Sequence, residues 1–172
     1  MIVIKPFVTN IFWFGFLSLI TGCANNRGNY EIENDITKYV NEGLLEIEEL
    51  ERKPLEVYSG VIGTHYKSKQ EVYDTLKNKV IGDYERFYNA LREIHPSEEV
   101  VKKLHGKYIQ GAEKILNGFK IKMLGIEINN EKMILEANEM IEHGSAEIAQ
   151  WREALNSLCV KHGVAPEKKQ EE

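Results

Sequence analysis

The sequence predicts an all-α protein, an antiparallel up-down four-helix bundle that follows a cleaved signal peptide. Four stretches of the chain repeat apolar residues at spacings of three and four, which is the period of one helix face. Short polar connections join these stretches, and short connections place consecutive helices antiparallel. No stretch alternates apolar and polar residues with a period of two or carries a hairpin turn signal, so nothing indicates a sheet.

The first 22 residues have the pattern of a secretory signal peptide. The apolar run from residue 11 to residue 20 is about half of the roughly 20 residues that a membrane-spanning helix needs. It leads directly into Ile20-Thr21-Gly22-Cys23. This tetrapeptide resembles the lipobox of bacterial lipoproteins. The resemblance implies that the Cys23 thiol accepts a diacylglyceryl group and that cleavage after Gly22 makes Cys23 the first residue.

This resemblance also sets the expected organisation and location of the chain. We expect a signal peptide at 1–22, a lipidated cysteine with its tether at 23–33, a helical bundle at 34–163 and a charged tail at 164–172. Two or three acyl chains, at about 0.8 kcal/mol per buried CH₂, would hold the protein permanently on the lipid bilayer. An aspartate after the cysteine often retains a lipoprotein at the inner membrane, and this chain has Ala24 there. The outer membrane is therefore favoured in a Gram-negative cell, and the outer face of the cytoplasmic membrane in a Gram-positive one.

The charge of the chain argues against a nucleic acid partner, and its cysteine content argues against an internal disulfide. The chain has 22 basic and 27 acidic residues, and loss of Lys5 with the signal peptide would leave 21 against 27. An acidic domain is unsuited to the phosphate backbone, so we expect no nucleic acid partner. Lipidation of Cys23 would leave Cys159 without a partner for a disulfide, and its apolar neighbours predict that it is a small buried hydrophobe.

The first two predicted helices are set by caps and prolines. Asn34 and Asp35 are good capping residues for the first helix, which we expect to continue through Pro54 as one helix kinked there or as two nearly coaxial helices. Ser68 followed by Glu71 is a capping box that opens the second helix. The sequence His95-Pro96 ends that helix, because the residue before proline avoids helical geometry.

The last two helices follow the same logic. The Ser97 hydroxyl with two following glutamates predicts the start of the third helix, and Asn129-Asn130 predicts the turn that ends it. The fourth helix should end at a Gly163 cap. Gly111 in the third helix and Gly144 in the fourth can mark a close crossing, although an incidental small residue is the alternative.

Residues able to bind a metal or catalyse a reaction are sparse. Glu139 and His143 flank the apolar stripe and should face water, while His95 and His105 lie ten positions apart across a helix break. We predict no metal and no cofactor beyond the lipid, with His95 and His105 as the remaining candidates for ligands. The chain has no zinc-binding spacing, no phosphate-binding loop and no nucleophile elbow, so we predict no catalytic residue.

Tyrosine is the most suggestive residue type in this chain. All eight tyrosines follow the signal peptide, and Tyr58, Tyr84 and Tyr108 fall on the apolar stripes. Such residues can form the rim of a core with their hydroxyls at the surface. Alternatively, they can form a tyrosine-rich surface for a partner.

Together these features predict a lipoprotein of the cell envelope that binds or scaffolds another envelope protein and is not an enzyme. The alternative is a module that binds a small ligand or a metal. An enzyme is the least favoured class.

Overall fold

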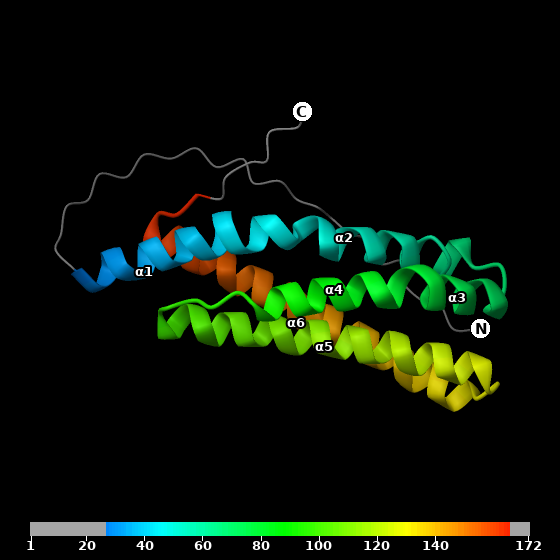
Figure 1. Ribbon diagram of the computed structural model, residues 1–172. Helices are drawn as coiled ribbons and strands as arrows, with labels where there is room; N and C mark the ends of the chain where they lie inside the picture. The colour runs from blue at the N-terminus through cyan, green and yellow to red at the C-terminus, as the bar shows by residue number, and fades with distance from the viewer. Residues whose placement is uncertain (1–26, 166–172) are drawn as a thin grey trace.

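The structure, a computed structural model, describes residues 27–165, and this part of the chain is all-helical as the sequence predicts (Figure 1). The signal peptide, the lipobox with Cys23 and most of the charged tail lie outside the described residues. No strand occurs between residues 27 and 165. The elements are α1 (Arg27–Lys38), η1 (Tyr39–Leu44), α2 (Leu45–Ser59), η2 (Gly63–His65), α3 (Lys69–Thr75), η3 (Leu76–Val80), α4 (Ile81–Arg92), α5 (Glu99–Glu127) and α6 (Glu131–His162). Two of them, η1 and η3, are π-helical, and η2 is a 3₁₀ turn.

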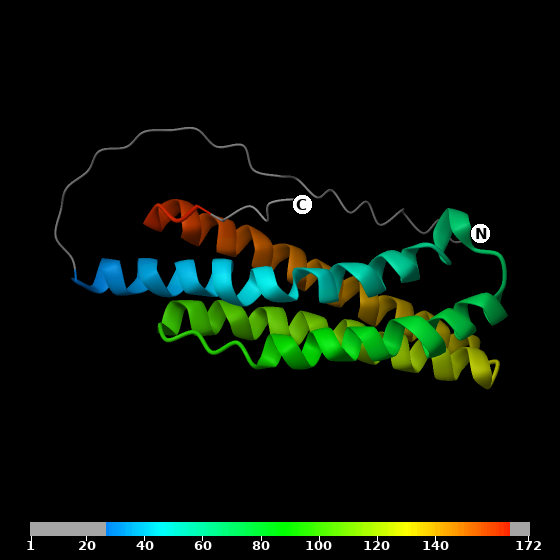
Figure 2. The same ribbon diagram turned by 45° about the horizontal axis from the view of Figure 1, so that its top comes forward.

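These elements join into continuous helical runs at 27–59, 69–92, 99–127 and 131–162. Figures 1 and 2 show that each run doubles back beside the run before it, and that α5 and α6 form the longest pair. The molecule therefore has two ends. The start of α1, the α4–α5 connection and the end of α6 lie at one end, which we call the α1 end. The η2 segment and the α5–α6 turn lie at the other, which we call the turn end.

The beginning of the first helix differs from the prediction. α1 is already helical at Arg27, so the predicted start at Asn34 was wrong, and residues 27–33 are helix and not tether. Asp35 is buried, and its two carboxylate oxygens accept hydrogen bonds from the backbone N–H groups of Ser97 and Glu98, each at 2.8 Å. Asp35 thus caps α5 from a different helix, at the end where the helix dipole favours negative charge. The predicted Ser97 hydroxyl cap was wrong, because Glu98 occupies the N-cap position.

The irregularity predicted at Pro54 does not break the helix. Pro54 is buried inside α2, and the chain stays helical from α1 through Ser59. The departure from α geometry lies upstream at η1, where a π turn accommodates an extra residue. One continuous helical run is therefore the correct choice of the two arrangements that the sequence allowed.

The other predicted caps are confirmed. The Ser68 hydroxyl accepts a hydrogen bond from the Glu71 amide at 3.1 Å, as the capping box requires. At the α5–α6 turn, Asn129 has a positive φ of 52° and Asn130 caps α6 by accepting from the Met133 amide at 3.2 Å. Gly163 ends α6 in the left-handed conformation with φ 70°. These local signals fixed the connections between the helical runs.

α5 and α6 approach closely along a row of small residues. A Cβ atom placed on Gly111 would lie 3.0 Å from the Gly144 carbonyl oxygen, and one placed on Gly118 would lie 3.0 Å from the Ala137 carbonyl oxygen. The predicted close crossing at Gly111 and Gly144 is therefore confirmed. Gly111, Gly118 and Gly125 recur every seven residues, so the contact repeats every two turns along the pair.

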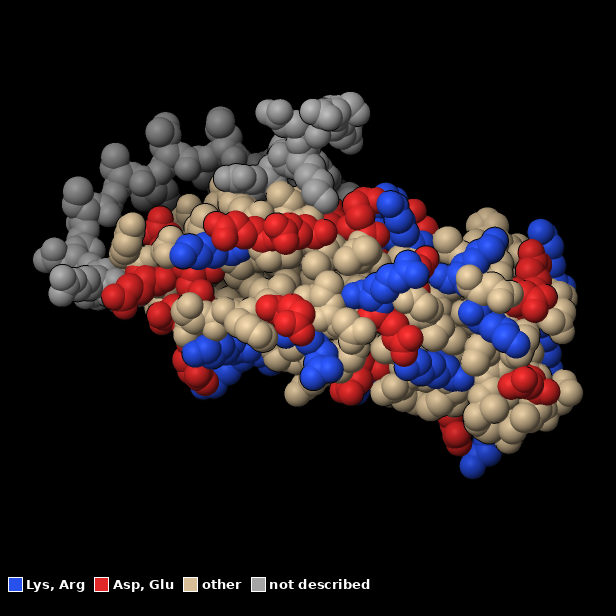
Figure 3. Space-filling model, viewed as in Figure 1, with Lys and Arg blue, Asp and Glu red and all other residues tan. Residues whose placement is uncertain are grey.

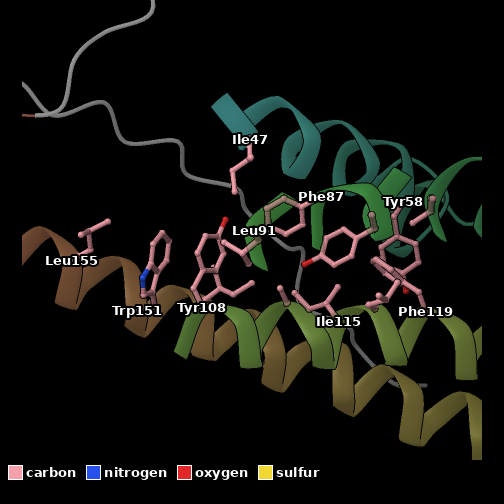
Figure 4. Packing of buried hydrophobic residues seen from close by; sticks show 14 of the residues in the cluster. Ile47, Tyr58, Phe87, Leu91, Tyr108, Ile115, Phe119, Trp151 and Leu155 are labelled. Atoms are coloured by element: carbon pink, nitrogen blue, oxygen red, sulfur yellow. The ribbon is translucent and has the colours of Figure 1, made fainter. Parts of the chain in front are cut away.

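Aromatic rings fill the space between this pair and the other helices. The Tyr108 and Trp151 rings stack at a centroid distance of 3.8 Å, and Phe119 packs edge-on against Tyr58 at 4.7 Å (Figure 4). Cys159 is buried in this cluster, as predicted, and burial raises the pKa of its thiol. The core is thus continuous from α2 to the end of α6.

Candidate functional site

Tyr58, Tyr84 and Tyr108 do not form a partner surface. Their exposed fractions are 6%, 0% and 3%, and all three belong to the aromatic core. The prediction of a tyrosine-rich binding surface at these residues was wrong. The stripe on which they lie is the centre of the buried face, so even their hydroxyls are withdrawn from water.

The buried tyrosines instead pair with ionisable groups inside the bundle. Among the described residues, Lys122 contacts the Tyr58 hydroxyl and His105 contacts the Tyr39 hydroxyl, and the Tyr108 hydroxyl acts on the carboxyl group of Glu51. A tyrosine hydroxyl can donate or accept a hydrogen bond, so it suits either protonation state of its partner.

Lys122 is the most unusual of the three. Its ammonium group donates to the Tyr58 hydroxyl and to the Asn138 side-chain oxygen, both at 2.7 Å, and it lies 5.1 Å from the centre of the Tyr58 ring. Neither hydrogen-bond acceptor is a carboxylate. Burial therefore lowers the pKa of Lys122 from 10.5 to about 8. A positive charge is held in the core by neutral groups alone.

His105, one of the two candidate metal ligands, is buried. Its Nδ1 atom lies 3.1 Å from the Tyr39 hydroxyl. Its Nε2 atom has no hydrogen-bond partner among the described residues. Burial lowers the pKa of His105, His95 lowers it further, and the backbone of Leu91 and Ile94 opposes the change.

Because the charge of His95 lowers the pKa of His105, the two candidate metal ligands influence each other electrostatically. His95 is exposed and His105 is buried, with its Nδ1 atom occupied by Tyr39. Among residues 27–165 no group of three or more histidine, cysteine, aspartate or glutamate side chains is placed to hold a metal ion. Glu139 and His143 are exposed, as predicted.

Glu51 completes the set from α2. The residue is half-buried, and its carboxyl group and the Tyr108 hydroxyl influence each other's pKa. Desolvation raises the pKa of Glu51, while the Tyr108 hydroxyl and the charge of Arg152 oppose the rise. The Tyr84 hydroxyl faces the same carboxyl group without a hydrogen bond of its own, and burial raises the pKa of Tyr84 well above its ordinary value.

These three ionisable groups could have been found in the sequence. Glu51 falls between the buried residues Ile47, Pro54 and Tyr58 at helical spacing, whereas its apolar neighbour Leu50 is exposed. Lys122 and His105 likewise fall on the buried face of α5. A charged residue at an apolar stripe position was the signal that sequence reasoning passed over.

The exposed apolar side chains define a second type of site. At the turn end, four large apolar residues are exposed: Tyr66, Leu124, Ile128 and Leu135. The Tyr73 hydroxyl donates to Glu127 at 3.2 Å and Lys69 pairs with Glu131, so α3 is fastened to the α5–α6 turn. An open hollow of about 450 Å³, lined by residues of polar type, lies beside this end along α3 and η3. The turn end thus offers exposed apolar side chains next to a shallow hollow.

Comparison with known proteins adds no relative. No protein-family model, curated protein or solved structure matches this chain. In the described part, every helix is too short or too polar to cross a bilayer.

Proposed function

We propose that this protein is a lipid-anchored component of the bacterial cell envelope that works by binding another envelope protein, not by catalysis. The residues Ile20-Thr21-Gly22-Cys23 support the anchor, with Cys23 as the lipid-bearing residue and the bilayer as its attachment site. We further propose that the helical runs form an antiparallel up-down four-helix bundle, which their doubling back in Figures 1 and 2 supports.

The observation that carries the binding function is the set of exposed apolar residues at the turn end. Exposed apolar patches mark surfaces that another protein covers. Tyr66 and Ile128 are more than half exposed, and they lie in the chain next to the segments that the Tyr73–Glu127 and Lys69–Glu131 contacts join. The partner is a protein with an apolar contact surface, since rigid apolar side chains gain little from binding a charged small molecule.

The interior offers less support for chemistry. Lys122 and His105 are buried in the packed core, and each is already hydrogen-bonded to a tyrosine hydroxyl. General acid–base catalysis requires a titratable group within hydrogen-bond reach of a substrate. This arrangement favours a structural role for these pairs.

The test is cross-linking in intact cells followed by mass spectrometry. We expect wild-type protein to capture one dominant envelope protein, and Ile128→Asp to lose it. Leu50→Asp is the matched control, because Leu50 is an exposed apolar residue on α2 and not at the turn end. Cys23→Ser should lose both the lipid mass and the partner.

Equal capture by Ile128→Asp and wild type would contradict the binding surface. A reproducible enzymatic activity that one polar substitution in the bundle abolishes would contradict the non-catalytic class.

A further inference from the structure

The α1 end of the molecule carries apolar side chains that no part of the described chain covers. Tyr30 and Val160 are 71% and 67% exposed, the highest values among the exposed large hydrophobic residues, and Val100 in the first turn of α5 is also exposed. They come from three helices whose termini lie at the same end (Figures 1 and 2). Tyrosine favours the layer between water and lipid because it has an apolar ring and a polar hydroxyl.

The position of the chain outside the structure identifies what covers this end. Cys23 precedes Arg27, the first residue of α1, by four positions. Since an extended chain spans at most about 3.6 Å per residue, the start of α1 lies within about 14 Å of Cys23. A lipid on Cys23 would hold the α1 end at the membrane surface. The turn end would be roughly 44 Å further along α5, at about 1.5 Å per helical residue.

The distance along the molecule from Tyr30 to the start of α5 matches the thickness of the lipid headgroup layer. That layer is about 5–8 Å thick on each face of a bilayer. Tyr30 precedes Asp35, the cap of α5, by five positions in the same helix, which is roughly 8 Å along the helix axis. Tyr30 can therefore enter the headgroups while the start of α5 and Val100 rest on their outer boundary.

The long side formed by α1, η1 and α2 is unsuited to the same surface. Figure 3 shows acidic side chains gathered along the edge over these helices. Glu42, Glu46 and Glu48 are exposed on these helices. Anionic headgroups repel such a row, so rotation of the molecule onto this side is unfavourable.

We propose that the α1 end docks on the phospholipid headgroup layer through Tyr30, Val100 and Val160, so that the helical runs stand out from the membrane. This proposal rests on the proposed lipid attachment at Cys23. It makes the turn end the surface that projects furthest from the bilayer.

The test uses full-length lipidated protein in vesicles of phosphatidylethanolamine and phosphatidylglycerol. Two variants, Tyr30→Cys and Tyr66→Cys, are each labelled with one environment-sensitive fluorophore in a Cys159→Ala background. Both positions are exposed tyrosines, and they lie at opposite ends. We expect lipids spin-labelled at the headgroup to quench the label at position 30 several-fold more than the label at position 66. In vesicles without spin-labelled lipid, only the fluorophore at position 30 should shift its emission to shorter wavelength.

A third protein tests the docking residues themselves. Val100→Ser combined with Val160→Ser alters only exposed side chains, so the helices should still form, which circular dichroism checks. We expect quenching at position 30 to fall toward the value at position 66. Unchanged quenching would overturn the role of the two valines.

The outcomes separate this inference from the proposed function. Equal quenching of the two labels, in a protein whose mass shows the lipid, would overturn the upright orientation and leave the anchor intact. If wild-type protein carries no lipid and behaves like Cys23→Ser, the proposed anchor fails and the docking proposal fails with it.

Discussion

In the described part of the chain, tyrosine side chains lie beside three ionisable groups whose pKa burial shifts. Tyr58 lies beside Lys122 and Tyr39 beside His105, and the Tyr108 hydroxyl acts on the Glu51 carboxyl group. In every case burial moves the pKa toward the neutral form: down for the lysine and the histidine, up for the glutamate. A carboxylate partner would have favoured the charged form of Lys122 through its negative charge. A neutral phenol accepts a hydrogen bond from the ammonium group but carries no such charge.

Lys122 gives a prediction for stability at alkaline pH. Its pKa is about 8 in the folded protein and about 10.4 in an unfolded chain, so between these values the unfolded state binds more protons. Stability should therefore rise with pH across this window. The measurement is urea unfolding from pH 7.5 to 10 of wild type and Lys122→Met. The wild type should gain about 2–3 kcal/mol relative to the variant over this range.

The range ends near pH 10 because tyrosine ionisation begins there in the unfolded chain. Burial raises the pKa of Tyr58 and Tyr84, so their contribution to stability falls as pH rises further. Parallel stability curves for wild type and Lys122→Met below pH 10 would contradict the account of Lys122.

At the scale of single residues, the sequence predicted which apolar side chains are buried better than it predicted which ionisable side chains are buried. Cys159 is buried, as its apolar neighbours predict. Glu51 and Lys122 were not identified from the sequence, although their spacing places them beside buried residues. Whether a polar residue on a stripe turns inward depends on a partner from another helix, and a single sequence does not pair helices.

The α5–α6 pair shows how glycine acts at the scale of an element. In an exposed helix, glycine costs about 0.5–1 kcal/mol relative to alanine. At Gly118 this cost is offset by close packing, because a Cβ atom there would lie 2.6 Å from the Ile141 side chain and 3.0 Å from the Ala137 backbone oxygen. A side chain at this position would force the two helices apart.

Two substitutions in the same helix should have opposite effects. Gly118→Ala should destabilise the protein by about 1–3 kcal/mol through overpacking. Gly106→Ala should stabilise it by about 0.5–1 kcal/mol, since a Cβ at Gly106 meets nothing within 4 Å. Thermal and urea unfolding of both variants provide the measurement. A gain in stability from Gly118→Ala would show that the close contact does not limit the helix separation.

Local signals predicted some element boundaries and missed others. Ser68, Asn130 and Gly163 cap the helices that follow or precede them, because each acts on backbone groups within three or four residues. Asp35 was misassigned because the backbone amides that it caps lie 62 and 63 residues away. Long-range capping leaves no local pattern to recognise.

At the scale of the whole molecule, stability should be unevenly distributed. α5 and α6 are the longest helices and touch backbone to backbone at Gly111 and Gly144. α3 has seven residues and lies between a polar loop and the π turn η3. Regions with few buried contacts open at lower free energy than the core.

Native-state hydrogen exchange should therefore rank the helices. We expect the slowest exchange in the middle of α5 and α6 and faster exchange in α3 and in the first two turns of α1. Mass spectrometry of proteolytic fragments after exchange provides the measurement. Protection of α3 equal to that of α5 would contradict an uneven distribution of stability.

The Asp35 cap also has a mechanical consequence. The carboxylate lies eight positions after the start of α1 and accepts two hydrogen bonds from the backbone amides that directly precede α5. Tension applied at the N-terminus would pull α1 along its own axis and load these two bonds, in shear, together with the packing around Tyr39. The force would then be transmitted to α5, which packs closely along α6. An external force would therefore be distributed over α5 and α6 before α1 could separate from them.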